Sequence, residues 1–145
     1  MHKNAHIRWF RDIRLDDVGL VGGKTASLGE LYSVLSAQGV RVPNGFALTA
    51  DAYRKALTEA GAWDRLHRLL DAVDKTRIDA LTRCAADARA IVFDATGTDW
   101  LRREVAESYR QLESDYSANV AVAVRSSATA EDLPTQALQD NTKVF

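Results

Sequence analysis

The sequence predicts a helix-rich α/β domain with few strands and a helical insert between them. Three observations lead to this fold class. Long central stretches repeat apolar residues at three- and four-residue spacing, which is typical of helices packed along one side. The run VAVAV at 120–124 is apolar on both faces and rich in β-branched side chains, as interior strands are. A shorter apolar run, FAL at 46–48, also suits a buried strand.

The first forty residues predict one short strand and one helix. Residues 7–10 are suited to the strand, and the turn-rich stretch 14–17 follows it. A helix is expected to begin at Gly23 or Lys24 and to stop at Gly39, because glycine commonly follows the last turn of a helix. Its apolar stripe consists of Leu28, Leu31 and Leu35.

The middle of the chain is predicted to be mostly helical. The sequence VPNG at 42–45 has turn chemistry, and Thr49 can cap a helix from Ala50 to about Ala60. Four helices are expected between there and residue 117. The clearest carries an apolar stripe of Ile78, Leu81, Ala85, Ala88 and Val92, and another carries Leu101, Val105, Leu112 and Tyr116.

Composition narrows the class of protein. The chain has 145 residues, which corresponds to one domain or to one piece of a larger domain. It contains 19 basic and 20 acidic residues. This balance argues against a general nucleic-acid or membrane-surface binder. Cys84 has no partner for a disulfide and falls on the inner stripe of its predicted helix. With no run of about 18 apolar residues and no signal-peptide pattern, we expect a soluble cytoplasmic protein.

The first motif that carries chemistry is VGGKTASLGE at 21–30, the Gly-Gly-Lys motif. It ends like a phosphate-binding P-loop, but Val18 stands where the first glycine belongs and acidic residues precede it, so we reject that interpretation. Gly22 and Gly23 still permit close approach of a ligand to a helix start, and Lys24 adds a mobile charge. On this motif alone, a glycine turn before a surface helix with a solvated lysine is the preferred alternative.

The second motif, AVRSSATAEDLP at 123–134, is the Arg-Ser-Ser motif. An apolar strand is predicted to end abruptly at Arg125, and strand ends are where ligands gather in α/β sheets. The guanidinium can bind phosphate oxygens in a bidentate manner while Ser126 and Ser127 supply further donors. A structural ion pair of the arginine with Glu131 or Asp132 explains the residues equally well.

The remaining polar residues indicate no catalytic or metal site. His2, His6 and His67 are scattered without the spacing of metal ligands, and no serine–histidine–aspartate arrangement is suggested. We therefore assign no catalytic residue and no metal ligand from this sequence. Phosphate, in particular the phosphate of a nucleotide, is the leading ligand.

Taken together, the two motifs resemble the phosphoenolpyruvate synthase family, the pyruvate, water dikinases. Supporting matches are Gly39 with Val40 and the run VPNGFALTADAY at 42–53. The resemblance runs from about Trp9 to Pro134. The sequence is similar, more distantly, to pyruvate phosphate dikinase and rifampin phosphotransferase.

The resemblance implies an N-terminal lobe of an ATP-grasp-type domain over residues 1–134. In this family ATP phosphorylates a histidine on a separate domain, which passes the group to pyruvate and yields phosphoenolpyruvate, AMP and phosphate. The family's motifs assign ATP-phosphate contact to Lys24 and Arg125, which reverses the preference stated above for a solvated lysine. The expected partners are the nucleotide and the remaining domains, in a gluconeogenic transferase. The whole expected cofactor site comprises Lys24, Arg125, Gly22, Gly23, Ser126 and Ser127.

This sequence also departs from the family pattern. Residues 135–145 diverge where the family has a glycine-bearing loop over the phosphates, and no glycine follows Gly97. The second half of the grasp, the acidic ligands of Mg²⁺, the histidine domain and the pyruvate-binding barrel are also missing. We therefore expect the chain to fold but not to catalyse the reaction alone. A non-enzymatic binding or regulatory module, or the lobe of a phosphotransferase with another acceptor, remains an alternative.

Overall fold

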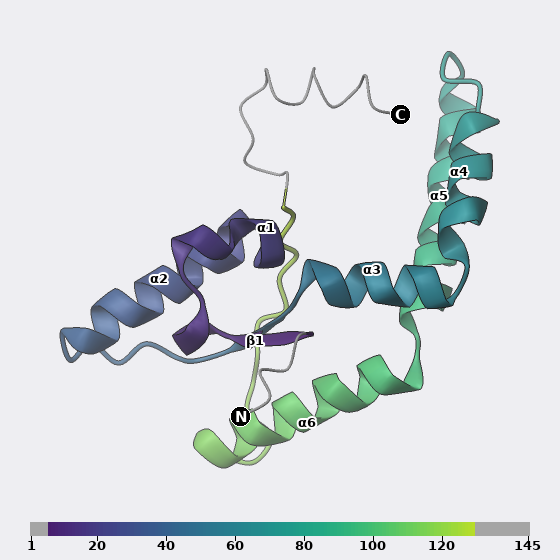
Figure 1. Ribbon diagram of the computed structural model, residues 1–145. Helices are drawn as coiled ribbons and strands as arrows, with labels where there is room; N and C mark the ends of the chain where they lie inside the picture. Colours follow the sequence, from purple (N-terminus) through teal and green to yellow (C-terminus); the bar gives the residue numbers. More distant parts are fainter. Residues whose placement is uncertain (1–5, 130–145) are drawn as a thin grey trace.

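The computed structural model describes residues 6–129 and shows a helical protein built around one pair of short strands (Figure 1). Helices α1 and α2 lie on one side of the strand pair and α6 on the other, while α3 leads to a projecting hairpin of α4 and α5. The elements are β1 (Ile7–Trp9), the 3-10 turns η1 (Phe10–Asp12) and η2 (Leu15–Asp17), α1 (Val18–Val21), α2 (Gly23–Ala37), β2 (Phe46–Leu48), α3 (Ala50–Glu59), α4 (Ala62–Asp71), α5 (Ile78–Thr96) and α6 (Asp99–Asp115).

The two predicted N-terminal strands form and pair with each other. β1 and β2 are antiparallel, and Arg8 stands opposite Ala47 in the register. The amide of Thr49 donates to the carbonyl of His6 at 2.9 Å beyond the end of the ladder. Leu48 is 44% exposed, so the expectation of a buried second strand is wrong.

Helix α2 begins and ends as predicted but buries a different face. It starts at Gly23, and Gly39 follows its end with a φ of +81°. The helix buries Thr25, Ala26 and Gly29, whereas Leu31 of the expected stripe is 48% exposed. A Cβ on Gly29 would lie 2.5 Å from the side chain of Ile13, so the small residues of this face let η1 and its following residue pack closely.

Two small clusters of buried side chains form the core of the described residues. The first joins the start of the chain to α1 and α2, and the second joins α3, α4 and α5. The first contains Ile13, Val21 and Ala26 with Phe10, Leu20 and Ala47 against them; the second contains Leu57, Ala62, Leu66 and Ala95 with Ala88, Ile91 and Val92.

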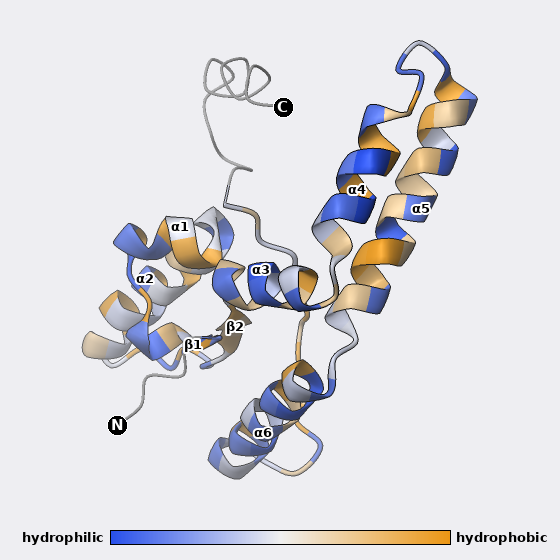
Figure 2. Ribbon diagram, turned by 45° about the vertical axis from the view of Figure 1, so that its right-hand side comes forward, coloured by the Kyte–Doolittle hydropathy of each residue, from blue (hydrophilic) through white to orange (hydrophobic). Residues whose placement is uncertain are grey.

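The helical insert confirms several local predictions. The side chain of Thr49 caps α3 by accepting a hydrogen bond from the amide of Ala52 at 3.2 Å. Cys84 is buried, as expected, and its thiol lies against the carbonyl of Leu69. The predicted stripe of α5 is only partly covered: Ile78 is 82% exposed, whereas Ala88 and Val92 are half-buried against the second cluster. Figure 2 shows hydrophilic and hydrophobic residues interspersed along the α4–α5 hairpin.

The interior strand predicted at 120–124 does not form among the described residues. Within residues 6–129 this segment has no assigned strand and no backbone–backbone hydrogen bond, and Val124 is 93% exposed. A strand satisfies its backbone groups only through a neighbouring strand, and the part of the chain that the structure describes offers none here. None of the helices within residues 6–129 is long and apolar enough to cross a membrane.

Candidate functional site

The Gly-Gly-Lys motif forms a sharp junction between two helices. Gly22 separates α1 from α2 with φ +81° and ψ 160°, a conformation that is essentially restricted to glycine. Its amide donates to the carbonyl of Val18 at 2.8 Å, and its own carbonyl accepts from Ala26 at 2.9 Å. A helical turn, not a strand, precedes the glycines, which agrees with the rejection of a P-loop.

The Arg-Ser-Ser motif lies directly against this junction. The hydroxyl of Ser127 accepts a hydrogen bond from the amide of Thr25 at 3.3 Å, although the two residues are 102 positions apart. A Cβ added to Gly22 would lie 2.3 Å from Ser127 Oγ and 2.9 Å from the carbonyl oxygen of Ala128. The structure therefore brings the two motifs into contact.

The two cations of these motifs are both on the surface. Lys24 and Arg125 are exposed, Ser126 is exposed, and Gly23 and Ser127 are half-buried. Lys24 directly precedes Thr25, and Arg125 lies two residues before Ser127. The Thr25–Ser127 contact therefore limits the separation of the two cationic Cα atoms to about 15 Å. The acids proposed as alternative partners of Arg125, Glu131 and Asp132, lie outside the described residues.

Comparison with known proteins places the chain in a family. Residues 18–141 match the family model of the pyruvate phosphate dikinase AMP/ATP-binding domain. The chain belongs to this family. The match includes both the glycine junction and the serine that contacts it.

Curated relatives of this AMP/ATP-binding domain are phosphoenolpyruvate synthases. The chain is 40% identical to the phosphoenolpyruvate synthase of Escherichia coli over 96% of its length, and 46% identical to that of Pseudomonas aeruginosa over 89%. A probable phosphoenolpyruvate synthase of Methanocaldococcus jannaschii is 41% identical over 88%. The chain spans only 17%, 16% and 10% of these three relatives, so it corresponds to a small part of each.

The donor set at the junction suits phosphate and not a divalent metal. Its side chains are a lysine, an arginine and hydroxyls, whereas Mg²⁺ is bound through carboxylates and water. Within residues 6–129, no group of three histidine, cysteine or acidic side chains is placed to hold a metal ion. The residues of this part of the domain do not fit a Mg²⁺ site.

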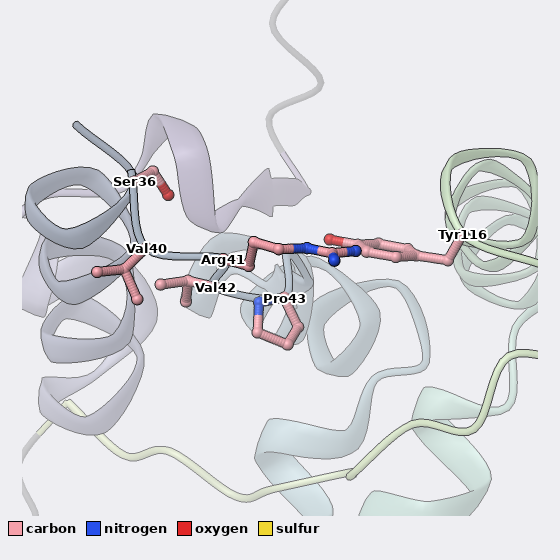
Figure 3. A pocket seen from close by; sticks show the side chains of 6 residues that line it. All are labelled: Ser36, Val40, Arg41, Val42, Pro43 and Tyr116. Atoms are coloured by element: carbon pink, nitrogen blue, oxygen red, sulfur yellow. The ribbon is translucent and has the colours of Figure 1, made fainter. Parts of the chain in front are cut away.

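A separate hollow lies at the other end of α2. It has a volume of about 420 Å³ and is open to solvent, and Figure 3 shows Arg41 extending in the direction of Tyr116. The phenol oxygen of Tyr116 accepts a hydrogen bond from the amide of Asn44. The lining residues are Ser36, Val40, Arg41, Val42, Pro43 and Tyr116. Because α2 has 15 residues, about 20 Å separate this hollow from the glycine junction.

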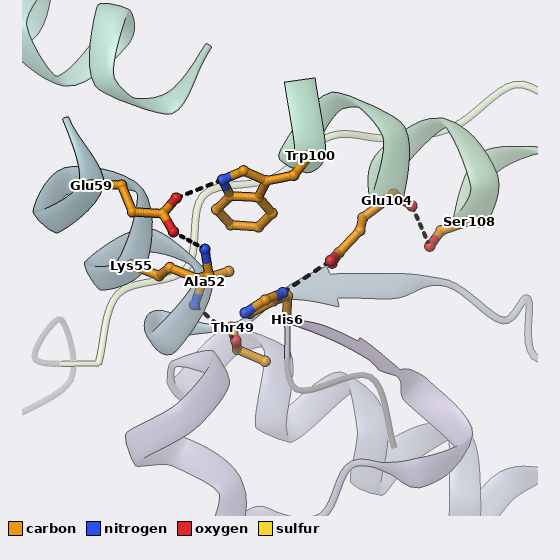
Figure 4. Close-up of polar contacts among 8 residues, drawn as sticks. All are labelled: His6, Thr49, Ala52, Lys55, Glu59, Trp100, Glu104 and Ser108. Carbon is orange, nitrogen blue, oxygen red and sulfur yellow. Dashed lines mark hydrogen bonds and ion pairs between the residues drawn. The ribbon is translucent and has the colours of Figure 1, made fainter. Parts of the chain in front are cut away.

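A polar network joins His6, the residue before β1, to α3 and α6, and sequence reasoning missed it. His6 Nδ1 lies 3.0 Å from Glu104 Oε1, so this histidine is not the isolated residue that its position in the sequence suggested (Figure 4). The indole of Trp100 donates to Glu59 at 2.9 Å. The hydrogen bond from Lys55 lowers the pKa of Glu59. No spacing rule links these residues, because they come from three elements that meet only in the folded chain.

Proposed function

We propose that this chain is the ATP-binding N-terminal lobe of a phosphoenolpyruvate-synthase-like dikinase. The observation that carries the proposal is the hydrogen bond between Thr25 and Ser127, because it joins the two motifs that supply the cations. Membership of the AMP/ATP-binding domain family supports a nucleotide as the ligand. The proposed lobe is of the ATP-grasp type and acts in a cytoplasmic enzyme of gluconeogenesis.

In this proposal the side chains of both motifs surround the nucleotide phosphates. Lys24 contributes a compact positive charge, and Arg125 contributes a planar fork that matches two phosphate oxygens. The N-terminus of α2 adds a partial positive charge at the same place. Gly22 and Gly23 keep the junction free of side chains, and Ser126 and Ser127 add hydroxyl donors.

The chain's residues bind and orient ATP and do not complete the reaction. In the full dikinase, ATP, pyruvate and water would give AMP, phosphoenolpyruvate and phosphate through a phosphohistidine on another domain. Mg²⁺ would be held by residues outside this chain. We expect the isolated chain to unfold cooperatively on heating and to form no AMP from ATP and pyruvate.

The proposal is tested in a full-length dikinase that carries this domain. Lys24→Ala and Arg125→Ala are each expected to lower kcat/KM for ATP by about 10- to 150-fold, since a charge-assisted hydrogen bond contributes about 1.5–3 kcal/mol. Lys75→Ala and Arg89→Ala serve as matched controls, because both residues are exposed on the α4–α5 hairpin, away from the two motifs. Equal losses in the test and control variants would refute the site.

A further inference from the structure

We propose that Ser127, in addition to the hydroxyl donor proposed above, is a positioning residue: its oxygen caps the N-terminus of α2 from a distant part of the chain and so holds Arg125 near Lys24. The cap itself is independent of any ligand. Its consequence for nucleotide binding rests on the proposed function.

The cap fills a place that the helix cannot fill by itself. Helix α2 begins after Gly22, which has no side chain to accept hydrogen bonds from the first-turn amides. Thr25 is the third residue of this helix, and its amide is one of the two that an N-cap side chain usually satisfies. Ser127 Oγ accepts from this amide in place of a local serine or threonine.

Glycine at position 22 makes this long-range cap possible. A Cβ there would stand 2.3 Å from Ser127 Oγ, closer than real Cβ contacts ever are, and 2.9 Å from the Ala128 carbonyl oxygen. Residue 22 must therefore lack a side chain for the segment of Ser127 and Ala128 to approach it this closely. This requirement exists whether or not a ligand is bound.

Within residues 6–129, the position of Arg125 depends on this contact because few other hydrogen bonds hold its segment. The hydroxyl of Tyr109 donates to the carbonyl of Val120 at 2.8 Å, and the amide of Asn119 donates to Glu113 at 2.9 Å, both at the beginning of the segment. Among residues 120–129 no backbone ladder forms. Ser127 is the anchor on the far side of Arg125.

A nucleotide-free measurement tests the cap. In the ¹⁵N-labelled 145-residue chain, Ser127→Ala is expected to speed hydrogen exchange of the Thr25 amide about threefold to tenfold, the range expected for losing one hydrogen bond. Ser126→Ala is the matched control, because that neighbouring hydroxyl is exposed and makes no hydrogen bond within the described residues. Ser127→Thr keeps the hydroxyl and is expected to retain slow exchange.

A titration with MgATP tests the positioning role. Ser127→Ala is expected to weaken binding severalfold, and adding Arg125→Ala to it is expected to cost less affinity than Arg125→Ala costs in the unsubstituted chain. A merely structural cap would change exchange and leave the affinity and this coupling unaltered.

The two measurements separate the inference from the proposed function. Unchanged Thr25 exchange in Ser127→Ala, or an equal change in Ser126→Ala, would overturn the cap. Unaltered MgATP affinity in Ser127→Ala would overturn the positioning role. If MgATP shifted neither motif in the unsubstituted chain, the proposed function and the role of Ser127 toward nucleotide would both fail, and the exchange data would still decide the cap.

Discussion

Helix α3 and a strand at 120–124 are both predicted from the sequence, yet the two regions differ in what completes them. Helix α3 buries Ala52, Ala56 and Leu57 against its neighbours and satisfies its backbone within itself. The 120–129 segment has no assigned helix or strand, and Val122 and Val124 are 50% and 93% exposed. Apolar sequence therefore produces a core element only where the backbone also finds hydrogen-bond partners.

The largest expected difference between these regions is in stability. Leu57 is fully buried, so Leu57→Ala is expected to lower the free energy of unfolding by about 2–5 kcal/mol through lost burial and a residual cavity. Val124→Ala removes methyl groups that are already in water, and its effect is expected to stay within about 0.5 kcal/mol. Urea unfolding followed by circular dichroism compares the two. A similar loss for both variants would mean that the segment is packed.

A smaller effect distinguishes two glycines with the same φ. Gly39 has φ +81° and open space around it, so Gly39→Ala is expected to cost about 1–2 kcal/mol through backbone strain alone. Gly22 has the same φ, but its Cβ would also collide with Ser127 and Ala128. Gly22→Ala is expected to cost about 1–3 kcal/mol more, from overpacking and from the ψ of 160° that puts Gly22 in a conformation essentially restricted to glycine. Equal losses in thermal unfolding would show that the 126–128 segment does not press on the junction.

The smallest effect concerns two threonines at helix starts. Thr49 caps α3, so Thr49→Ala is expected to cost about 1 kcal/mol. Thr98 precedes α6 without capping it, and its buried hydroxyl oxygen has no hydrogen-bond partner among the described residues. Thr98→Ala is therefore expected to be neutral or stabilising. If both variants were destabilised to the same extent, Thr49 could no longer be distinguished from Thr98 as a helix cap.

Local sequence signals predicted the local structure well. The start of α2, the cap at Thr49 and the short strands at 7–10 and 46–48 follow from glycine, threonine and β-forming residues at adjacent positions. The buried face of α2 could not be predicted, because the close packing of Ile13 on Gly29 outweighs the leucine stripe. The strand at 120–124 failed because pairing needs a second segment that the described residues do not supply.

In the candidate site, too, the local features could be predicted from the sequence and the long-range contact could not. The chemistry of Lys24, Arg125 and the glycines could be predicted from residue type and neighbours. The resemblance to a family then indicated ATP as the ligand that these residues would bind. The capping contact of Ser127 could not, because it joins residues 102 positions apart and has no spacing signature. The role of all six residues toward nucleotide stays a prediction.

The central claim is that the Gly-Gly-Lys and Arg-Ser-Ser motifs form one phosphate site. Titrating the ¹⁵N-labelled chain with MgATP, and separately with adenosine, tests it most directly. The account predicts amide shifts at 22–25 and 125–127 that follow a single weak binding curve with MgATP and are absent with adenosine. Shifts confined to one motif, or two motifs that titrate with different affinities, would contradict it.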